Sequence, residues 1–333
     1  MPLAHRICRL VSLFGARTVL AGATAIGLSL LGANVSAQTA TRPYQMSILA
    51  AWRGVTGASV DLPIFTRNVF GNNQSQPAGL SVAWLPADQN LDRHNIDWAR
   101  IVAVYVDEPY GAILKTAPCN VSDPGGPPEF SDLVNQRMVT LREMATQLRA
   151  RAPKARFWVN FTKKEIDLML DPGAGCPLNQ PYIDVVSMDI YGVSFIPDLS
   201  TRYNKLYLNR ATSHQQLALV PGTFTEGYDH QTPAQGAARL LGYFDYAASM
   251  NQRCELPLGP QGSTGFYDGC PIWMIAGWTG GVEPYPEDGS TYYLIDHPNS
   301  QLVFDTWQTQ VAIPRVDPSQ TRRMRQLIPL LTD

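Results

Sequence analysis

The 333-residue sequence predicts an α/β fold, a single (β/α)8 barrel with long βα loops that are stapled by disulfide bonds. Three observations favour it. Strand-like and helix-like stretches alternate, which is typical of either a closed barrel or an open doubly wound sheet. No GxGxxG or P-loop follows a predicted strand, so a nucleotide-binding open sheet has no support. Several predicted strands end in polar or aromatic residues, which a barrel would gather around one mouth.

The first 37 residues have the pattern of a secretory signal peptide. Three arginines precede an apolar stretch over residues 19–33, and the small residues Val35-Ser36-Ala37 offer a cleavage site. The stretch is too short, and too rich in Gly and Ala, for a membrane anchor, and no Cys follows it that could carry a lipid. We therefore expect a secreted or periplasmic protein that is monomeric and makes no membrane contact after cleavage.

Cleavage after Ala37 leaves 333 − 37 = 296 residues, 38–333, which is enough for one large domain. The three arginines leave with the leader, so the formal net charge changes from −2 to −5. This mild acidity argues against nucleic acid as a partner. Only 16% of the residues are charged, whereas 10% are aromatic and Pro and Gly number 26 each, as in a loop-rich extracytoplasmic enzyme.

Four cysteines remain after cleavage, and an even number in an exported chain indicates two disulfide bonds. We predict Cys119–Cys176, because both lie in loops that follow strand ends on one face of a barrel. We also predict Cys254–Cys270, because these two bracket one short loop. Zinc ligation is the competing interpretation, but the spacings contain no CxxC and the five His are scattered.

In the N-terminal third of the domain, only some of the strands can be predicted clearly. Residues 44–52 read as a first strand, whereas residues 57–84 contain only two short apolar pieces, at 60–65 and 80–84. Residues 101–106 form a mostly β-branched run, which is typical of a parallel strand buried on both faces. We count seven strands in the whole chain and expect the eighth within residues 57–84 or after residue 278.

The remainder alternates regularly. A helix is capped by Ser131-Asp132 and keeps apolar residues at helical spacing through Leu148. Short apolar runs then predict strands at residues 156–161, 183–190, 217–220 and 272–276. Stretches with an apolar face predict helices at residues 163–170, 199–211, 233–250, 302–309 and 320–331.

Carboxylates follow several of these strands, and paired carboxylates suit the hydrolysis of a glycosidic bond. That reaction needs one carboxyl group as proton donor and a second as nucleophile or base. Asp107 and Glu108 stand where Pro109 stops a strand; they point to opposite sides if the strand continues, and we take Glu108 as the donor. Asp189 and Glu226 are the candidates for the second carboxylate. Asp189 lies within an apolar strand, where an unpaired charge is costly.

Sugar rings also need flat apolar surfaces with polar edges. The sequence places aromatic residues near the same strand ends, together with side chains that can bind hydroxyl groups. We predict that substrate is bound by Asp107, Tyr110, Asn160, Tyr191, Phe224 and Trp278.

The tripeptide Asp107-Glu108-Pro109 resembles the Asn-Glu-Pro motif of retaining (β/α)8 glycoside hydrolases. In that superfamily the Glu that ends strand four is the acid/base, and a Glu that ends strand seven is the nucleophile. Counting from Asp107-Glu108 as strand four, the resemblance implies that Glu108 is the acid/base and Glu226 the nucleophile. Trp278 ends strand eight, where these enzymes often carry a sugar-stacking Trp. The resemblance implies a poly- or oligosaccharide substrate and no cofactor, although Asp stands here in place of Asn.

Other interpretations remain open. The segment from Ser187 to Gly192 (SMDIYG) resembles the Asp/Tyr strand end of chitinase-like barrels, which use substrate-assisted chemistry. The barrel could bind carbohydrate without cleaving it. Alternatively, Asp107, Glu108 and Asp189 could hold a divalent metal for the hydrolysis of another bond, although no His falls at the expected mouth. No Ser lies in a GxSxG elbow, so an α/β-hydrolase triad has no support.

Overall fold

The computed structural model describes residues 42–49, 60–69, 71–87, 90–115, 128–170, 176, 178–190, 198–222, 232–252, 254, 270–278 and 301–315. The chain divides into two units, Met1–Gln38 and Thr39–Asp333, and all described residues belong to the second. The predicted signal peptide and the predicted helix at 320–331 lie outside the described residues.

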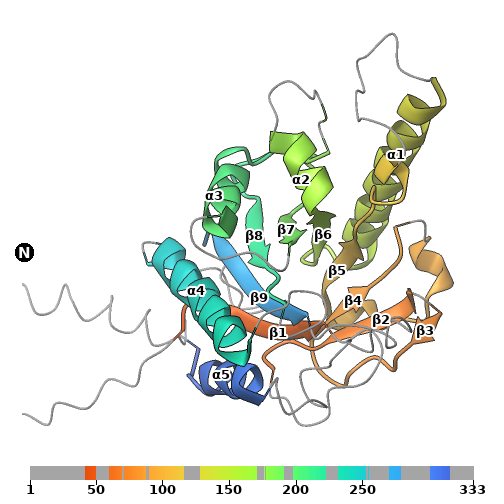
Figure 1. Cartoon of the computed structure of the whole chain (residues 1–333). Coiled ribbons are helices and arrows are strands. Elements are labelled where there is room, and N and C mark those ends of the chain that lie inside the picture. The colour runs from red at the N-terminus through yellow and green to blue at the C-terminus, as the bar shows by residue number, and fades with distance from the viewer. Residues whose placement is uncertain are drawn as a thin grey trace, which may run out of the picture. The chain divides into compact units, whose positions relative to one another are not determined.

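The core of the second unit is a curled, mostly parallel sheet of nine strands in the order β1-β9-β8-β7-β6-β5-β4-β2-β3 (Figure 1). All neighbouring strands are parallel except β2 and β3. Their bounds are β1 (Gln45–Leu49), β2 (Ile64–Val69), β3 (Asn72–Asn73), β4 (Ser81–Trp84), β5 (Ile101–Asp107), β6 (Arg156–Thr162), β7 (Val185–Asp189), β8 (Gln216–Leu219) and β9 (Ile272–Trp278).

The two ends of the curled sheet meet at the start of β2. The backbone N–H of Asp61 donates to the carbonyl of Met46 at 2.9 Å, and the Asp61 carboxylate accepts from the Met46 N–H at 2.7 Å. The Ser47 hydroxyl donates to the carbonyl of Leu62. Arg42 clamps the same carboxylate with two bonds of 2.5 and 2.7 Å. These contacts join β1 to the segment before β2, although no ladder pairs the two strands among the described residues.

Among the described residues, five α-helices cover one face of the sheet (Figure 1). They are α1 (Pro128–Arg151), α2 (Lys163–Leu170), α3 (Ser200–Leu208), α4 (Pro233–Asn251) and α5 (Gln301–Val311), with the 3-10 turns η1 (Leu91–Arg93), η2 (Trp98–Arg100) and η3 (Ile113–Lys115). Strand side chains such as Val104, Val159 and Ile275 pack with helix side chains such as Leu141 and Leu240 in the larger core. No helix among these is long and apolar enough to cross a bilayer.

A second core lies on the other side of the sheet, here called the inner face. Strand residues alternate between the two sides, so Val104 and Val106 face the helices while Ala103, Tyr105 and Asp107 face inward. The inner face is filled by large side chains from most strands, including Leu49, Ile64, Val82, Trp84, Tyr105, Trp158, Val185, Ala218, Trp273 and Ala276. Burial on both sides explains why residues 101–106 are apolar throughout.

The stretch at 57–84, which the sequence left unclear, contributes β2, β3 and β4. Counted along the chain, the parallel strands are β1, β2, β4, β5, β6, β7, β8 and β9, so β5 is the fourth and β8 the seventh. Between β1 and β5, the part of the chain that is described contains 3-10 turns and no α-helix. Short connections therefore let four strands fit before residue 108, and the long helices that a regular (β/α)8 pattern predicts appear only after β5.

The predicted disulfide Cys254–Cys270 is confirmed, with the two Cα atoms 4.9 Å apart. It ties a residue three positions beyond the end of α4 to a residue two positions before the start of β9. Cys176 is also disulfide-bonded. Its predicted partner, Cys119, lies outside the described residues.

Candidate functional site

The carboxyl end of β5 carries Asp107, whose side chain turns toward the inner face. Its Oδ1 atom accepts two hydrogen bonds, from the Tyr105 hydroxyl at 2.7 Å and from Nδ2 of Asn160 at 2.8 Å. Asn160 is the direct neighbour of Asp107 in the β5–β6 register. Within the described part of the chain, no hydrogen bond is made to its Oδ2 atom.

A chain of donors leads to this carboxylate. The indole N–H of Trp158 donates to the Ser187 hydroxyl at 2.7 Å, and that hydroxyl donates to Oδ1 of Asn160 at 2.6 Å. An indole can only donate, so Ser187 accepts from Trp158; the Ser187 hydrogen points to Oδ1 of Asn160, and Nδ2 of Asn160 points to Asp107. Asn160, Trp158 and Ser187 are all fully buried. The strands β6 and β7 thus fix the direction of every bond in the chain.

The pKa of Asp107 is raised to about 7, first by burial and second by the negative charge of Glu108. The hydrogen bonds from Asn160 and Tyr105 act in the opposite direction because they stabilise the charged form. The carboxyl group therefore keeps its proton to a higher pH than an ordinary aspartic acid does. A group of this acidity is able both to donate and to accept a proton at pH 7.

Glu108 follows directly but occupies a different environment. It is exposed, and its backbone has a positive φ of 39°, which turns the chain out of the strand. Its N–H still donates to the carbonyl of Asn160 at 2.9 Å, and its carbonyl accepts from the N–H of Gly111. Asp107 therefore faces the inner network, while Glu108 lies at the solvent-exposed end of β5.

Asp189 ends β7, two strands away from β5. It pairs with Thr162 in the β6–β7 register and lies two residues beyond Ser187, so it faces the same side as Asp107. Its side chain is partly buried. Its negative charge contributes to the raised pKa of Tyr105, after burial and the charge of Asp107. Two carboxylates thus lie near the Tyr105 hydroxyl.

An aromatic series lines the inner face beside these carboxylates. Trp278 ends β9 and packs edge-on against Trp84, with ring centroids 5.6 Å apart. Trp84 contacts Tyr105 at 5.3 Å, and Tyr105 contacts Trp158 at 4.5 Å. Trp84, Tyr105 and Trp158 are buried, whereas Trp278 is only partly buried. Trp278 is therefore the member of the series that solvent or a ligand can reach.

The other predicted site residues fall into two groups. Tyr110 is fully buried in the core between sheet and helices, where its ring stacks on Phe161 with centroids 6.5 Å apart. Tyr110 therefore contributes to packing. It does not lie on the surface where the sequence predicted that it would contact substrate. Tyr191, Phe224 and Glu226 lie outside the described residues, and their roles stay predictions.

Sequence reasoning missed Glu165, a fully buried carboxylate in the first turn of α2. Its Oε1 atom accepts from the N–H of Tyr110 at 2.7 Å, and its Oε2 atom accepts from the N–H of Thr162 at 2.5 Å. Burial raises its pKa to about 8. Thr162 in turn accepts from the N–H of Glu165, which completes a capping box. The pattern Thr162-Lys-Lys-Glu165 was the available signal, and the extra bond to Tyr110 anchors the loop after Glu108.

Within the described ranges, no three His, Cys, Asp or Glu side chains come together as a metal site. No protein-family model matches the sequence, and no curated protein sequence matches it. The structure is similar to that of a mutant xylanase A from P fluorescens subsp. cellulosa, solved in complex with xylopentaose. The TM-score is 0.42 and the sequence identity 12%, over 83% of this chain and 99% of that chain. A similarity at this level assigns neither fold nor function.

Proposed function

We propose that this protein is an exported glycoside hydrolase that binds a poly- or oligosaccharide at the carboxyl ends of its parallel strands. The observation that carries the proposal is the environment of Asp107. A carboxyl group with a pKa of about 7 is held by two donors at a strand end, beside a second carboxylate and an accessible Trp. Glycosidic cleavage requires such a proton donor.

A closed (β/α)8 barrel is the architecture that we propose for the sheet. Eight parallel strands follow one another in chain order, and the ends of the sheet are joined by the hydrogen bonds of Met46 and Ser47 to the segment before β2. The inner face is filled by side chains in the manner of a barrel core. In such a barrel the active site lies at the carboxyl ends of the strands, where Asp107, Asp189 and Trp278 are.

We assign the role of proton donor to Asp107 rather than to Glu108. The donor chain from Trp158 fixes Oδ1, so Oδ2 is the oxygen that carries the proton toward the leaving group. Glu108 acts on Asp107 as a neighbouring negative charge that helps to retain this proton. This division of roles agrees with the structure, in which Asp107 faces the inner network and Glu108 does not.

Asp189 is our candidate for the second carboxylate. It lies two strands from Asp107 on the same face, which corresponds to roughly 10 Å across the sheet between backbones. Carboxyl groups about 6.5–9.5 Å apart leave room for a water molecule and give inversion, whereas about 5 Å gives retention. In an inverting reaction Asp189 would activate water, and the anomer of the first product distinguishes this from retention. Glu226 is the alternative, and the resemblance to retaining enzymes favours it.

The test is hydrolysis of a panel of poly- and oligosaccharides, with the anomer of the first product followed by NMR. We expect Asp107→Asn and Asp189→Asn to lower turnover by orders of magnitude with saccharide binding retained. Asp245→Asn, an exposed carboxylate on α4, is the matched control and should be fully active. Binding without cleavage of any saccharide would indicate a non-catalytic carbohydrate-binding barrel, and no binding at all would refute the proposal.

A further inference from the structure

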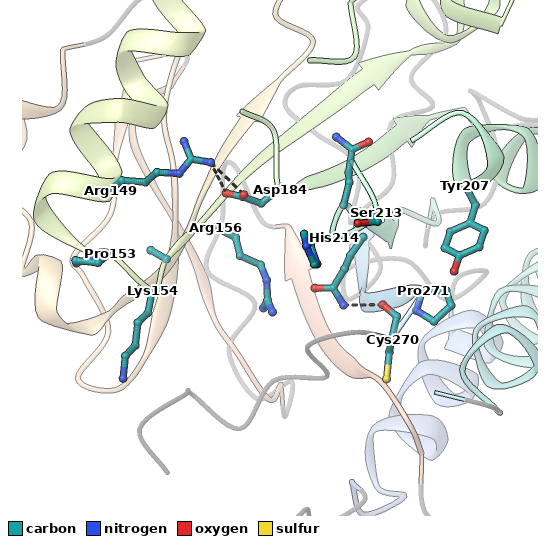
Figure 2. A pocket seen from close by; sticks show the side chains of 13 residues that line it. Arg149, Pro153, Lys154, Arg156, Asp184, Tyr207, Ser213, His214, Cys270 and Pro271 are labelled. Atoms are coloured by element: carbon teal, nitrogen blue, oxygen red, sulfur yellow. Dashed lines mark hydrogen bonds and ion pairs between the residues drawn. The ribbon is translucent and has the colours of Figure 1, made fainter. Parts of the chain in front are cut away.

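A separate pocket lies at the opposite end of the sheet, where β6, β7, β8 and β9 begin (Figure 2). It has a volume of about 330 Å³. Its walls come from the end of α1 and from the residues that immediately precede or start the four strands. They include Arg149, Lys154, Arg156, Asp184, His214 and Pro271. None of these residues belongs to the site around Asp107.

The described lining of the pocket is positively charged. Arg149, Lys154 and Arg156 contribute three cationic groups, and Asp184 is the single carboxylate among the described lining residues, which gives 3 − 1 = +2 with His214 neutral. The Asp184 carboxylate already accepts two bonds from Arg149, at 3.1 and 3.3 Å, and a third from the N–H of Phe157 at 2.8 Å. The negative charge of Asp184 is therefore largely balanced by Arg149 and by the Phe157 N–H.

Arg156 packs against an aromatic ring in the wall of the pocket. Its guanidinium lies over the ring of Trp273, 5.0 Å from the centroid, and Trp273 is fully buried. Burial lowers the pKa of Arg156 to about 10, although the charge of Asp184 acts against this shift. A partly dehydrated guanidinium is well suited to bind a tetrahedral oxyanion with two parallel hydrogen bonds.

The rest of the lining mixes apolar residues such as Ala155 and Pro271 with polar side chains. The Gln216 side chain donates to the carbonyl of Cys270 at 2.6 Å, and the disulfide to Cys254 holds Cys270 in turn. Figure 2 draws exposed His214 between Arg156 and Cys270. The pocket therefore offers hydrogen-bonding groups around its cations, and its volume lies at the small end of ligand sites.

We propose that this pocket binds a small anion of the phosphate class, held by Arg156 and Lys154. Two ligands share this chemistry: free inorganic phosphate and the phosphate group of a small monoester. The pocket lies away from the strand ends that carry Asp107, so the proposal stands apart from the proposed hydrolase activity.

The experiment is isothermal titration calorimetry of the purified protein in chloride buffer at constant ionic strength. Inorganic phosphate and glucose 1-phosphate are the probes. We expect saturable binding of at least one probe, weakened at least tenfold in Lys154→Gln and abolished in Arg156→Gln. Lys154 is exposed, so its variant is informative even if Arg156→Gln does not fold. Tighter binding of the monoester would identify an organic phosphate, and tighter binding of the free ion would identify phosphate itself.

Lys163→Gln is the matched control, because Lys163 is an exposed cation at the start of α2, beyond the carboxyl end of β6. It should bind both probes like the unaltered protein. No saturable heat with either probe would overturn the proposal. Equal binding by Lys154→Gln, Arg156→Gln and the control would also overturn it, since the anion would then bind elsewhere.

Discussion

Asn160 donates a hydrogen bond of 2.8 Å from Nδ2 to Oδ1 of Asp107, across the parallel pair β5–β6. The same amide accepts from Ser187, which accepts from the buried indole of Trp158. The orientation of a carboxylate at the strand end is therefore set by a residue of the inner core. This relationship makes the acidity of Asp107 sensitive to substitutions that never touch a substrate.

Replacing Asn160 with Ala should raise the pKa of Asp107 above 7. The Asn160 bond stabilises the carboxylate, so its loss favours the protonated form. The alkaline limb of the pH–rate profile should move to higher pH, and turnover should fall because Asp107 loses its orientation. Asn179→Ala, which removes an amide bonded to Gln215 at the other end of the sheet, is the control. An alkaline limb that stays in place would show that Asp107 is not the group that titrates.

Trp278→Ala should weaken oligosaccharide binding by about 1–3 kcal/mol, the scale for burying one large side chain. Trp278 is the partly exposed end of the aromatic series, so it can provide a platform without carrying the inner core. The measurement is a titration of tryptophan fluorescence with a panel of oligosaccharides. Divalent cations tested in the same way separate the carbohydrate interpretation from the metal interpretation. A response to cations alone would remove the role assigned to Trp278.

Arg42→Ala should destabilise the protein by about 3–5 kcal/mol, because it leaves the carboxylate of Asp61 without its main partner. Arg42 is 3% exposed and Asp61 11% exposed, and the pair joins the two ends of the sheet. The measurement is urea denaturation followed by circular dichroism. Arg100→Ala removes the partner of Asp97 in a pair at the surface and should destabilise the protein much less than Arg42→Ala. Equal losses in the two variants would argue against a special role for the junction.

Much of the strand order was predictable, because strands buried on both faces leave continuous apolar runs. β5, β6, β8 and β9 follow this rule, and counting Asp107 as the end of strand four agrees with the observed order. The pieces at 57–84 were harder to interpret because β2 and β4 are short and joined without α-helices in the described segments. Strands that are connected without helices cannot be recognised from an alternation of predicted helices and strands.

The site was predictable only in part, for a geometric reason. The sequence locates Asp107 at a strand end, but the neighbour that binds it depends on the register between β5 and β6. A register shift of one residue would turn Asn160 toward the helices. Ser187 gives no signal in a sequence, since a single Ser within an apolar strand has many possible roles. Glu165 could have been found from its capping box, but not its bond to Tyr110.

The last prediction uses the raised pKa of Glu165. A carboxyl group with a pKa near 8 in the folded protein and 4.5 in the unfolded chain binds its proton more tightly when folded. Its contribution to stability is complete below pH 4.5 and is lost as the pH rises toward 8. The slope approaches about 1.4 kcal/mol per pH unit at most. Asp107, with a pKa of about 7, adds a similar loss that continues through this range, so the difference between a Glu165 variant and the unaltered protein isolates the contribution of Glu165.

Glu165→Gln should therefore flatten the fall in stability between pH 7 and 8, as measured by urea denaturation at each pH. The amide cannot ionise, yet its oxygen can still accept from the N–H of Tyr110 or of Thr162. Glu143→Gln, which alters an exposed residue on α1, is the control and should keep the original slope. If Glu165→Gln keeps the same slope as the control, the buried carboxyl does not titrate in this range and another group must account for the loss.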